Sequence, residues 1–280
     1  MHGKISFFNS KLITTLGTTG TGSPGVSVPD GASVNTYGTM TTLIAAASNT
    51  MDSWGITIIP NANFNPSATA GEACLDIYTG TAGSEKALVT GLLVGGCYGT
   101  AQRTFWFPLF IPAGTRIAGQ LSAGTAQTSE FDVTIVLEGG GGPPPYPCGR
   151  KVTTYGTKVN NSRGQAVTPT ASGGAASTTV MTTSTTDTGI YVLPSFQEEV
   201  DTTISTQTFV NIGVGIGASG AGTRIGTWVF GKDASERQSG PIPTRGVFHR
   251  VPTGSRMTML ASNGGGNDTN YGGLIHVVIV

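Results

Sequence analysis

Charge is scarce in this sequence. Asp, Glu, Lys and Arg make up 11% of the 280 residues, less than half the usual share, and 15 basic residues balance 15 acidic ones. No basic patch or stripe is present, which argues against a nucleic-acid partner. No apolar run approaches the ~18 residues of a membrane-spanning helix, and the N-terminus lacks the basic-then-apolar pattern of a secretion signal. We therefore expect a protein that is made in the cytoplasm and has no membrane span.

Residues that commonly carry chemistry are few. The cysteines form no CxxC pair and have no histidine in ligand spacing, so neither a metal site nor a disulfide scaffold is predicted. The histidines are expected on the surface or on a strand face, and no cofactor is predicted. These residues are Cys74, Cys97, Cys148, His2, His249 and His276.

Three strings come close to known motifs. Gly215–Gly220 fits G-x-G-x-x-G, but a turn and a strand follow it, where a dinucleotide site needs a helix. Gly264–Asp268 lacks the acidic spacing of a calcium loop and is expected to be a hairpin tip. The acidic run Glu198–Asp201 is expected to be a solvated loop. An enzyme such as a depolymerase, using Glu198 or Glu199, is therefore the weakest of three functional hypotheses.

Glycine, threonine and serine are abundant, and they favour strands over helices. Gly accounts for 43 residues, and both Gly and β-branched Thr disfavour a helix interior. Short apolar or alternating runs, separated by turn residues, predict an all-β sandwich or barrel. An eight-stranded jelly roll is the first choice and an immunoglobulin-like sandwich the second. In the first half the predicted strands are Thr41–Ala47, Ser53–Ile59, Ala73–Thr79, Ala87–Val94, Phe105–Ile111, Thr115–Leu121 and Phe131–Leu137.

An internal repeat is the strongest pattern. Ile111–Ile117 (IPAGTRI) matches Val251–Met257 (VPTGSRM), and each copy then ends in an apolar strand, Phe131–Leu137 or Leu274–Val280. A period of this length indicates whole domains, because solenoid units are about 20–50 residues long. We therefore predict two tandem related β-sandwich domains.

Two further correspondences extend the repeat. Trp54–Ile59 resembles Phe209–Val214, and Asp76–Lys86 resembles Thr227–Arg237. The second pair shares a Ser-Glu-basic motif. We interpret this motif as a structural turn in which Glu85 or Glu236 pairs with Arg116 or Arg256 of the same domain.

A linker rich in Gly and Pro divides the chain. The predicted boundaries are 1–138 for domain one, 139–147 for the linker and 148–280 for domain two. Thr14–Thr41 is rich in Thr, Gly and Ser and is expected to be an extended arm that orders on contact with a neighbour.

Several strings in domain one resemble structural proteins of tailed-phage virions, namely Trp54–Ile58, Leu75–Glu85 and Phe107–Ile117. Domain two departs from the pattern, since His249 and Arg250 replace the Leu-Phe of the first copy. The resemblance implies a jelly-roll-like head or tail accessory protein and no catalytic residue.

The leading expectation is therefore a non-enzymatic subunit of a phage virion, in the capsid decoration or the neck, tail or fibre. Its expected partners are other virion proteins and copies of itself, with a trimer as one arrangement. The alternative is a module that binds host carbohydrate by stacking sugar rings on Trp106, Trp228 or Tyr271.

Overall fold

The fold is almost entirely β. The computed structural model describes residues 12–16, 25–62, 72–95, 104–124, 130–140, 143–158, 160–170, 176–198, 208–217, 222–232, 245–263 and 271–280. Within these ranges the one helical element is a 3-10 turn, Ala46–Ser48, and no helix is long and apolar enough to cross a bilayer. The all-β prediction is confirmed.

The described residues form eighteen strands, nine in each half of the chain. The first half contains β1 (Leu12–Leu16), β2 (Val26–Pro29), β3 (Thr41–Ile44), β4 (Ser53–Ala62), β5 (Ala73–Thr79), β6 (Lys86–Leu93), β7 (Phe105–Phe107), β8 (Ile117–Ala123) and β9 (Glu130–Gly139). The second half contains β10 (Lys151–Tyr155), β11 (Gln165–Val167), β12 (Ser177–Thr182), β13 (Gly189–Glu198), β14 (Thr208–Ile216), β15 (Thr223–Lys232), β16 (Val247–Val251), β17 (Met257–Asn263) and β18 (Tyr271–Ile279). Each of the seven strands predicted in the first half overlaps one of β3 to β9.

Each half forms two antiparallel sheets. Sheet I has the order β1-β9-β4-β7, with β2 also paired to β9, and sheet II has the order β3-β8-β5-β6. This is the strand order of a jelly roll whose first strand is split into β1 and β2. Sheet III (β10-β18-β13-β16, with β11 on β18) and sheet IV (β12-β17-β14-β15) repeat the same order with every strand number raised by nine. The two halves therefore share one topology.

The IPAGTRI and VPTGSRM turns are equivalent in detail. Gly114 and Gly254 both have positive φ, +75° and +82°, which glycine adopts without the strain of a Cβ atom. A buried polar side chain holds each turn from the loop before β4 or β13. Asn49 Nδ2 donates to Pro112 O at 3.0 Å, and Thr185 Oγ1 donates to Pro252 O at 2.7 Å. This pair of turns anchors the structural alignment of the two copies.

The strand order corrects two of the sequence correspondences. Trp54–Ile59 lies in β4, whereas Phe209–Val214 lies in β14, which is the counterpart of β5. The segment Asp76–Gly80 likewise lies at the end of β5, whereas Thr227–Gly231 lies in β15, the counterpart of β6. Short strands with alternating apolar residues resemble one another. The sequence comparison therefore matched each of these two segments to the strand that follows its structural counterpart.

The described part of the expected N-terminal arm is folded onto domain one. Val26–Pro29 (β2) pairs with β9 in register from Val26 opposite Val133 to Pro29 opposite Glu130. The backbone of Asn35 donates to Ala123 O, and that of Gly38 donates to Leu121 O. From Gly25 onward, the segment is therefore part of the sandwich.

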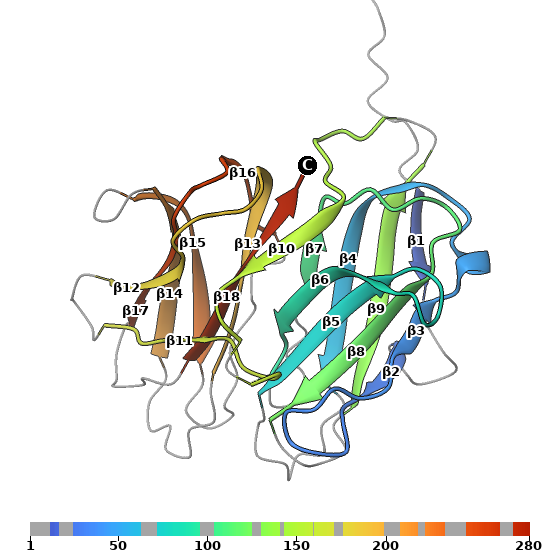
Figure 1. Ribbon diagram of the computed structural model, residues 1–280, viewed down its shortest axis with the longest axis horizontal. Coiled ribbons are helices and arrows are strands. Elements are labelled where there is room, and N and C mark those ends of the chain that lie inside the picture. Colours follow the sequence, from blue (N-terminus) through green and yellow to red (C-terminus); the bar gives the residue numbers. More distant parts are fainter. Residues whose placement is uncertain are drawn as a thin grey trace, which may run out of the picture.

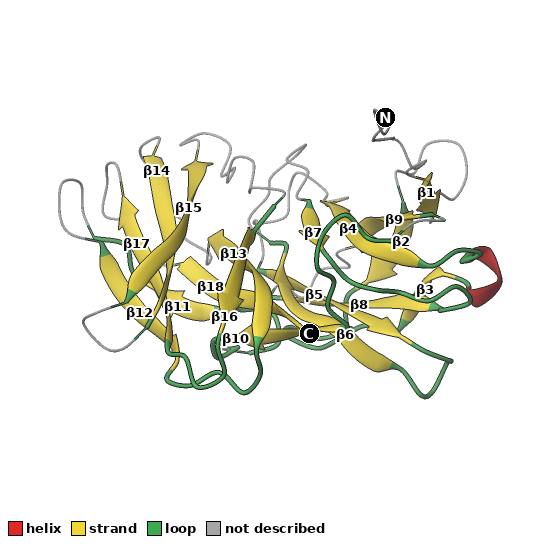
Figure 2. Cartoon of the chain, turned by 90° about the horizontal axis from the view of Figure 1, so that it is seen from above, coloured by secondary structure: helices red, strands yellow, loops and turns green. Residues whose placement is uncertain are grey.

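The two sandwiches lie side by side, with sheet III turned toward domain one (Figures 1 and 2). Alternation along β13 and β18 explains the contact, because successive side chains point to opposite faces of a sheet. Val192, Phe196 and Ile275 join the core of domain two, whereas Tyr191 and Val278 join the core of domain one. Every residue of β18 is therefore buried. Edge strands β6 and β7 of domain one are covered by this face, which protects their unpaired backbone edges.

Candidate functional site

The contact between the two domains, which we call the seam, contains several buried polar groups. Its centre is Asp76 on β5, where Ala73, Leu75 and Ile77 point into the core and Asp76 points the other way. The Asp76 side chain is 5% exposed. It accepts a hydrogen bond of 2.6 Å from the backbone N–H of Gly91, which occupies a bulge of β6 with φ +78°.

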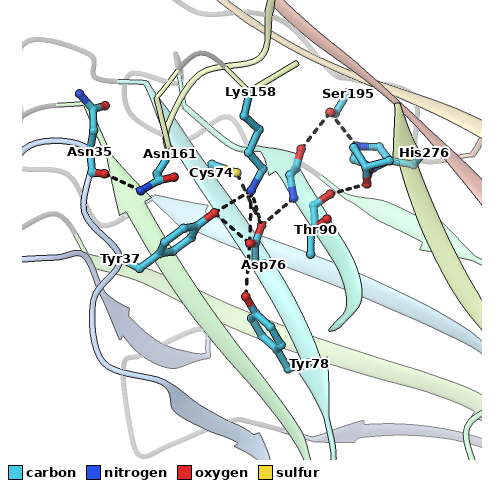
Figure 3. Close-up of polar contacts among 12 residues, drawn as sticks. Asn35, Tyr37, Cys74, Asp76, Tyr78, Thr90, Lys158, Asn161, Ser195 and His276 are labelled. Atoms are coloured by element: carbon cyan, nitrogen blue, oxygen red, sulfur yellow. Dashed lines mark hydrogen bonds and ion pairs between the residues drawn. The ribbon is translucent and has the colours of Figure 1, made fainter. Parts of the chain in front are cut away.

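Domain two contributes a cation to this centre. Lys158 Nζ lies 3.2 and 3.3 Å from the two carboxylate oxygens of Asp76 and donates to Tyr37 Oη at 2.6 Å (Figure 3). Tyr37 Oη in turn donates to Asp76 Oδ2 at 2.9 Å, and Tyr78 Oη donates to the same oxygen at 3.4 Å. We call Tyr37, Asp76, Tyr78 and Lys158 the central cluster.

The protons of the central cluster stay on the donors. Burial and the neighbouring negative charge of Asp76 raise the pKa of Tyr78 to about 12 and that of Tyr37 further above its usual range. Burial also raises the pKa of the adjacent Cys74 thiol to about 12, so this sulfur is not a thiolate at neutral pH. Both Asp76 oxygens already have donors. The cluster is therefore suited to clasping the domains together rather than to proton transfer.

A Ser–His pair lies deeper in the seam and is fully buried. Ser195 Oγ is 2.8 Å from His276 Nε2, and Thr154 Oγ1 is 3.1 Å from His276 Nδ1. Thr154 donates its hydroxyl proton to Thr90 O at 2.6 Å, so Nδ1 carries the imidazole proton and Nε2 accepts from Ser195. Burial lowers the pKa of His276 to about 3. The sequence placed His276 correctly in a strand, but its face is covered by domain one rather than by solvent.

A second set of polar groups, the lower cluster, lies where β5 begins. Gln197 of domain two is fully buried and accepts from the backbone N–H groups of Ala73 at 3.3 Å and Gly95 at 3.1 Å. Beside it, Glu72 Oε2 accepts a short hydrogen bond from Arg163 Nε of domain two. The Glu72 side chain is 3% exposed, and within the described part of the chain its other oxygen, Oε1, has no hydrogen-bond partner.

Glu72 is the candidate functional residue that the sequence did not indicate. A buried polar atom without a partner is uncommon and calls for an explanation, such as a catalytic role or an unseen ligand. The space beside the carboxylate is kept small, since a Cβ atom on Gly124 would lie 2.9 Å from Glu72 Oε2. A lone acid at the start of an apolar strand is a weak signal in a sequence. Its partner Arg163 is 91 residues away, beyond the linker.

The predicted ion pair is present in domain one, whereas in domain two one of its two residues lies outside the described ranges. In domain one, Arg116 Nη1 lies 2.9 Å from Glu85 Oε1 and also donates to Gly80 O. Hydrogen bonds from the backbone of Glu85 and from Arg116 lower the pKa of Glu85. In domain two, Arg256 is described, but Glu236 lies outside the described residues.

The aromatic residues predicted to stack on sugars are buried. Trp106 is 6% exposed, Trp228 5% and Tyr271 4%. Trp106 packs edge-on against Tyr191 across the seam, and Tyr271 stacks on Phe196 within domain two. Their rings belong to the hydrophobic cores, so they do not offer a surface platform for a glycan. The acidic run predicted as an alternative site begins at Glu198, the last residue of β13, and Glu199 lies outside the described residues.

Within the described ranges, no three His, Cys, Asp or Glu side chains come together as a metal site would require. No protein-family model and no curated protein sequence matches the chain.

Several solved structures have a similar arrangement. PNGF-II is 8% identical over 95% of this chain and 66% of its own, with a TM-score of 0.39. A peptide-N(4)-(N-acetyl-β-D-glucosaminyl)asparagine amidase is 12% identical over 96% of both chains, with a TM-score of 0.37. PNGase F, a glycosylasparaginase from Flavobacterium meningosepticum, is 13% identical over 97% of this chain and 96% of its own, with a TM-score of 0.35.

This finding corrects the expectation of a non-enzymatic virion subunit, together with its alternative of a carbohydrate-binding module. The similar structures are named as an asparagine amidase and a glycosylasparaginase, not as phage proteins. At 8–13% identity and TM-scores of 0.35–0.39, the likeness assigns no role to any residue of this chain. The virion location and the homo-oligomer stay predictions.

Proposed function

We propose that the protein is a hydrolase whose reacting group lies at the seam, with the Glu72 carboxylate as general base. The observation that carries the proposal is the asymmetry of this carboxylate. Arg163 of domain two binds Oε2, while the buried Oε1 has no hydrogen-bond partner among the described residues. A general base needs such an acceptor, oriented and without a competing donor.

The position of Glu72 supports the same proposal. Ligand sites form preferentially between domains, and Glu72 of domain one is held by a residue of domain two. An unsatisfied buried acceptor costs about 1–3 kcal/mol, which a purely structural carboxylate would not need to sustain. The central cluster and Gln197 fix the two domains on either side, so that Glu72 and Arg163 keep one geometry.

Turnover by a Glu72→Gln variant tests the proposal. The first substrate to assay is a peptide with a glycosylated asparagine, the compound class named for the structures above, followed by a panel of simple amides and glycosides. Loss of a general base should lower kcat by about 100-fold or more. Glutamine keeps the shape of the side chain, so the thermal midpoint should change little.

Glu85→Gln is the matched control, because Glu85 is also a domain-one carboxylate paired with an arginine but is not part of the seam. We expect this variant to keep the activity of the unsubstituted protein. The proposal is wrong if the unsubstituted protein turns over none of these substrates, or if Glu72→Gln retains full kcat.

A further inference from the structure

A hollow on the outer face of sheet IV is independent of the seam. Along β17, Met257, Met259 and Ala261 point into the core of domain two, so Thr258 and Leu260 point outward. These two side chains help to line a hollow of about 180 Å³ together with Thr178, Gly215, Gly217, Gly222 and Arg256. Gly215 forms part of its floor, since a Cβ atom there would come within 2.7 Å of Thr258 Oγ1.

Comparison of the two copies shows what is unusual about Arg256. Its counterpart Arg116 is fully engaged, because it donates to Glu85, to Gly80 O and to Thr42 Oγ1. The backbone hydrogen bond to this arginine is the same in domain two. Gly217 N donates to Arg256 O, just as Gly80 N donates to Arg116 O.

The side-chain partners are not kept. The strand pairing places Val180 where domain one has Thr42, so the hydroxyl is lost. Among the described residues, the Arg256 guanidinium forms no ion pair. The arginine at this position of the repeat is therefore fixed by hydrogen bonds in domain one, whereas its counterpart in domain two faces a hollow.

The described strands of sheet IV carry charge of one sign. They contain no Asp or Glu, whereas β15 carries Arg224, which pairs with Gly215 of the hollow. Arg224 reaches across the same face, because a Cβ atom on Gly213 would lie 3.2 Å from its Nε. Two arginines beside a small hollow, without a carboxylate on the described strands of the sheet, make an environment that favours an anion.

We propose that this hollow binds a small oxyanion through the Arg256 guanidinium, whose planar fork matches two oxygens of a carboxylate or a phosphate. The hydroxyl of Thr178 provides a further donor at the rim, whereas the hydroxyl of Thr258 on the floor donates to Gly215 O at 3.4 Å. Arg224 adds a second positive charge beside the first. The site does not depend on Glu72 or on hydrolysis, so either proposal can fail without the other.

Titration calorimetry with inorganic phosphate and with acetate tests the site, using chloride at matched ionic strength as the reference. The unsubstituted full chain should bind at least one of the two probes saturably. Arg256→Gln should weaken binding by about tenfold or more, since charge-assisted hydrogen bonds are lost. Arg256→Lys keeps the charge but not the fork and should give an intermediate affinity.

Arg116→Gln is the matched control, because it removes the equivalent arginine of the other copy. It should lower the stability of domain one through the loss of the Glu85 pair while leaving oxyanion binding unchanged. Absence of saturable binding of both probes up to about 10 mM would overturn the proposal. So would equal weakening by the Arg116 and Arg256 substitutions.

Discussion

The His276 side chain is surrounded by residues of both domains. It is fully buried, its Nδ1 proton faces Thr154, and its Nε2 accepts from Ser195. The ring also lies edge-on to Phe107 of domain one. Protonation would place a charge in an apolar interface already close to Lys158, so the folded protein keeps the neutral ring.

This depressed pKa predicts a pH-dependent stability. The pKa of His276 is about 3 in the folded protein and about 6.5 when unfolded, so between these values the unfolded chain binds the extra proton. Its contribution is complete above pH 6.5 and is lost as the pH falls toward 3. From pH 7 to pH 5 we expect the free energy of unfolding to drop by about 2 kcal/mol on account of this group.

Urea unfolding of the protein and of a His276→Gln variant at the two pH values measures the effect. The variant should start less stable at pH 7 but should lack the additional drop at pH 5. Equal pH dependence in both proteins would show that His276 is not the titrating group.

At the level of elements, the bulge in β6 couples domain one to β18. Gly91 has φ +78°, and a Cβ atom there would lie 2.8 Å from Leu274 Cδ1 of domain two. Gly83 has φ +82°, but nothing lies within 4 Å of its Cβ position. The two glycines therefore differ in the contact and not in the backbone conformation.

We expect Gly83→Ala to cost about 1 kcal/mol for the left-handed backbone alone. Gly91→Ala should cost about 3 kcal/mol, because the methyl group also overpacks the seam. Thermal or urea unfolding of both variants provides the measurement. Similar losses of stability in the two variants would mean that β18 shifts to accommodate the added methyl group.

The sequence patterns predicted the positions of strands better than they predicted which strands are equivalent in the two copies. Alternation placed Phe131, Val133, Ile135 and Leu137 on one buried face of β9, and all four are at most 1% exposed. The repeated Pro-x-Gly turn marked equivalent positions because its positive φ requires a particular residue. Alternation alone does not distinguish β4 from β5, however, so the two further correspondences of the repeat joined strands that are not equivalent.

The polar contacts of the seam could not be predicted in this way. Asp76 and Lys158 are 82 residues apart, and the repeated segment that contains Asp76 gives no sign of a partner in domain two. Their meeting depends on how two complete sandwiches dock, which is set by the apolar outward face of sheet III. The corresponding face of sheet I carries Thr57 and Glu138 where sheet III has Leu193 and Val278, so the two copies are not interchangeable at this surface.

The whole molecule is held together by the seam more than by the linker. Tyr191, Leu193 and Val278 of domain two are members of the same hydrophobic cluster as the core of domain one. Lys158 and Gln197 add an ion pair and buried hydrogen bonds across the same surface. Burial of several large apolar side chains at ~2 kcal/mol each would be lost if the domains separated.

Cleavage of the linker tests this view directly. A protease site inserted between Gly140 and Pro143 should allow the chain to be cut into two halves that still elute together on size-exclusion chromatography, because the seam keeps them associated. Leu193→Lys places a charge at a fully buried seam position and should make the cut halves elute separately, while the uncut variant remains one chain. A Lys151→Met variant, which alters an exposed pair within domain two, should behave like the unsubstituted protein. Separation of the unsubstituted halves after cutting would show that the linker, and not the seam, joins the domains.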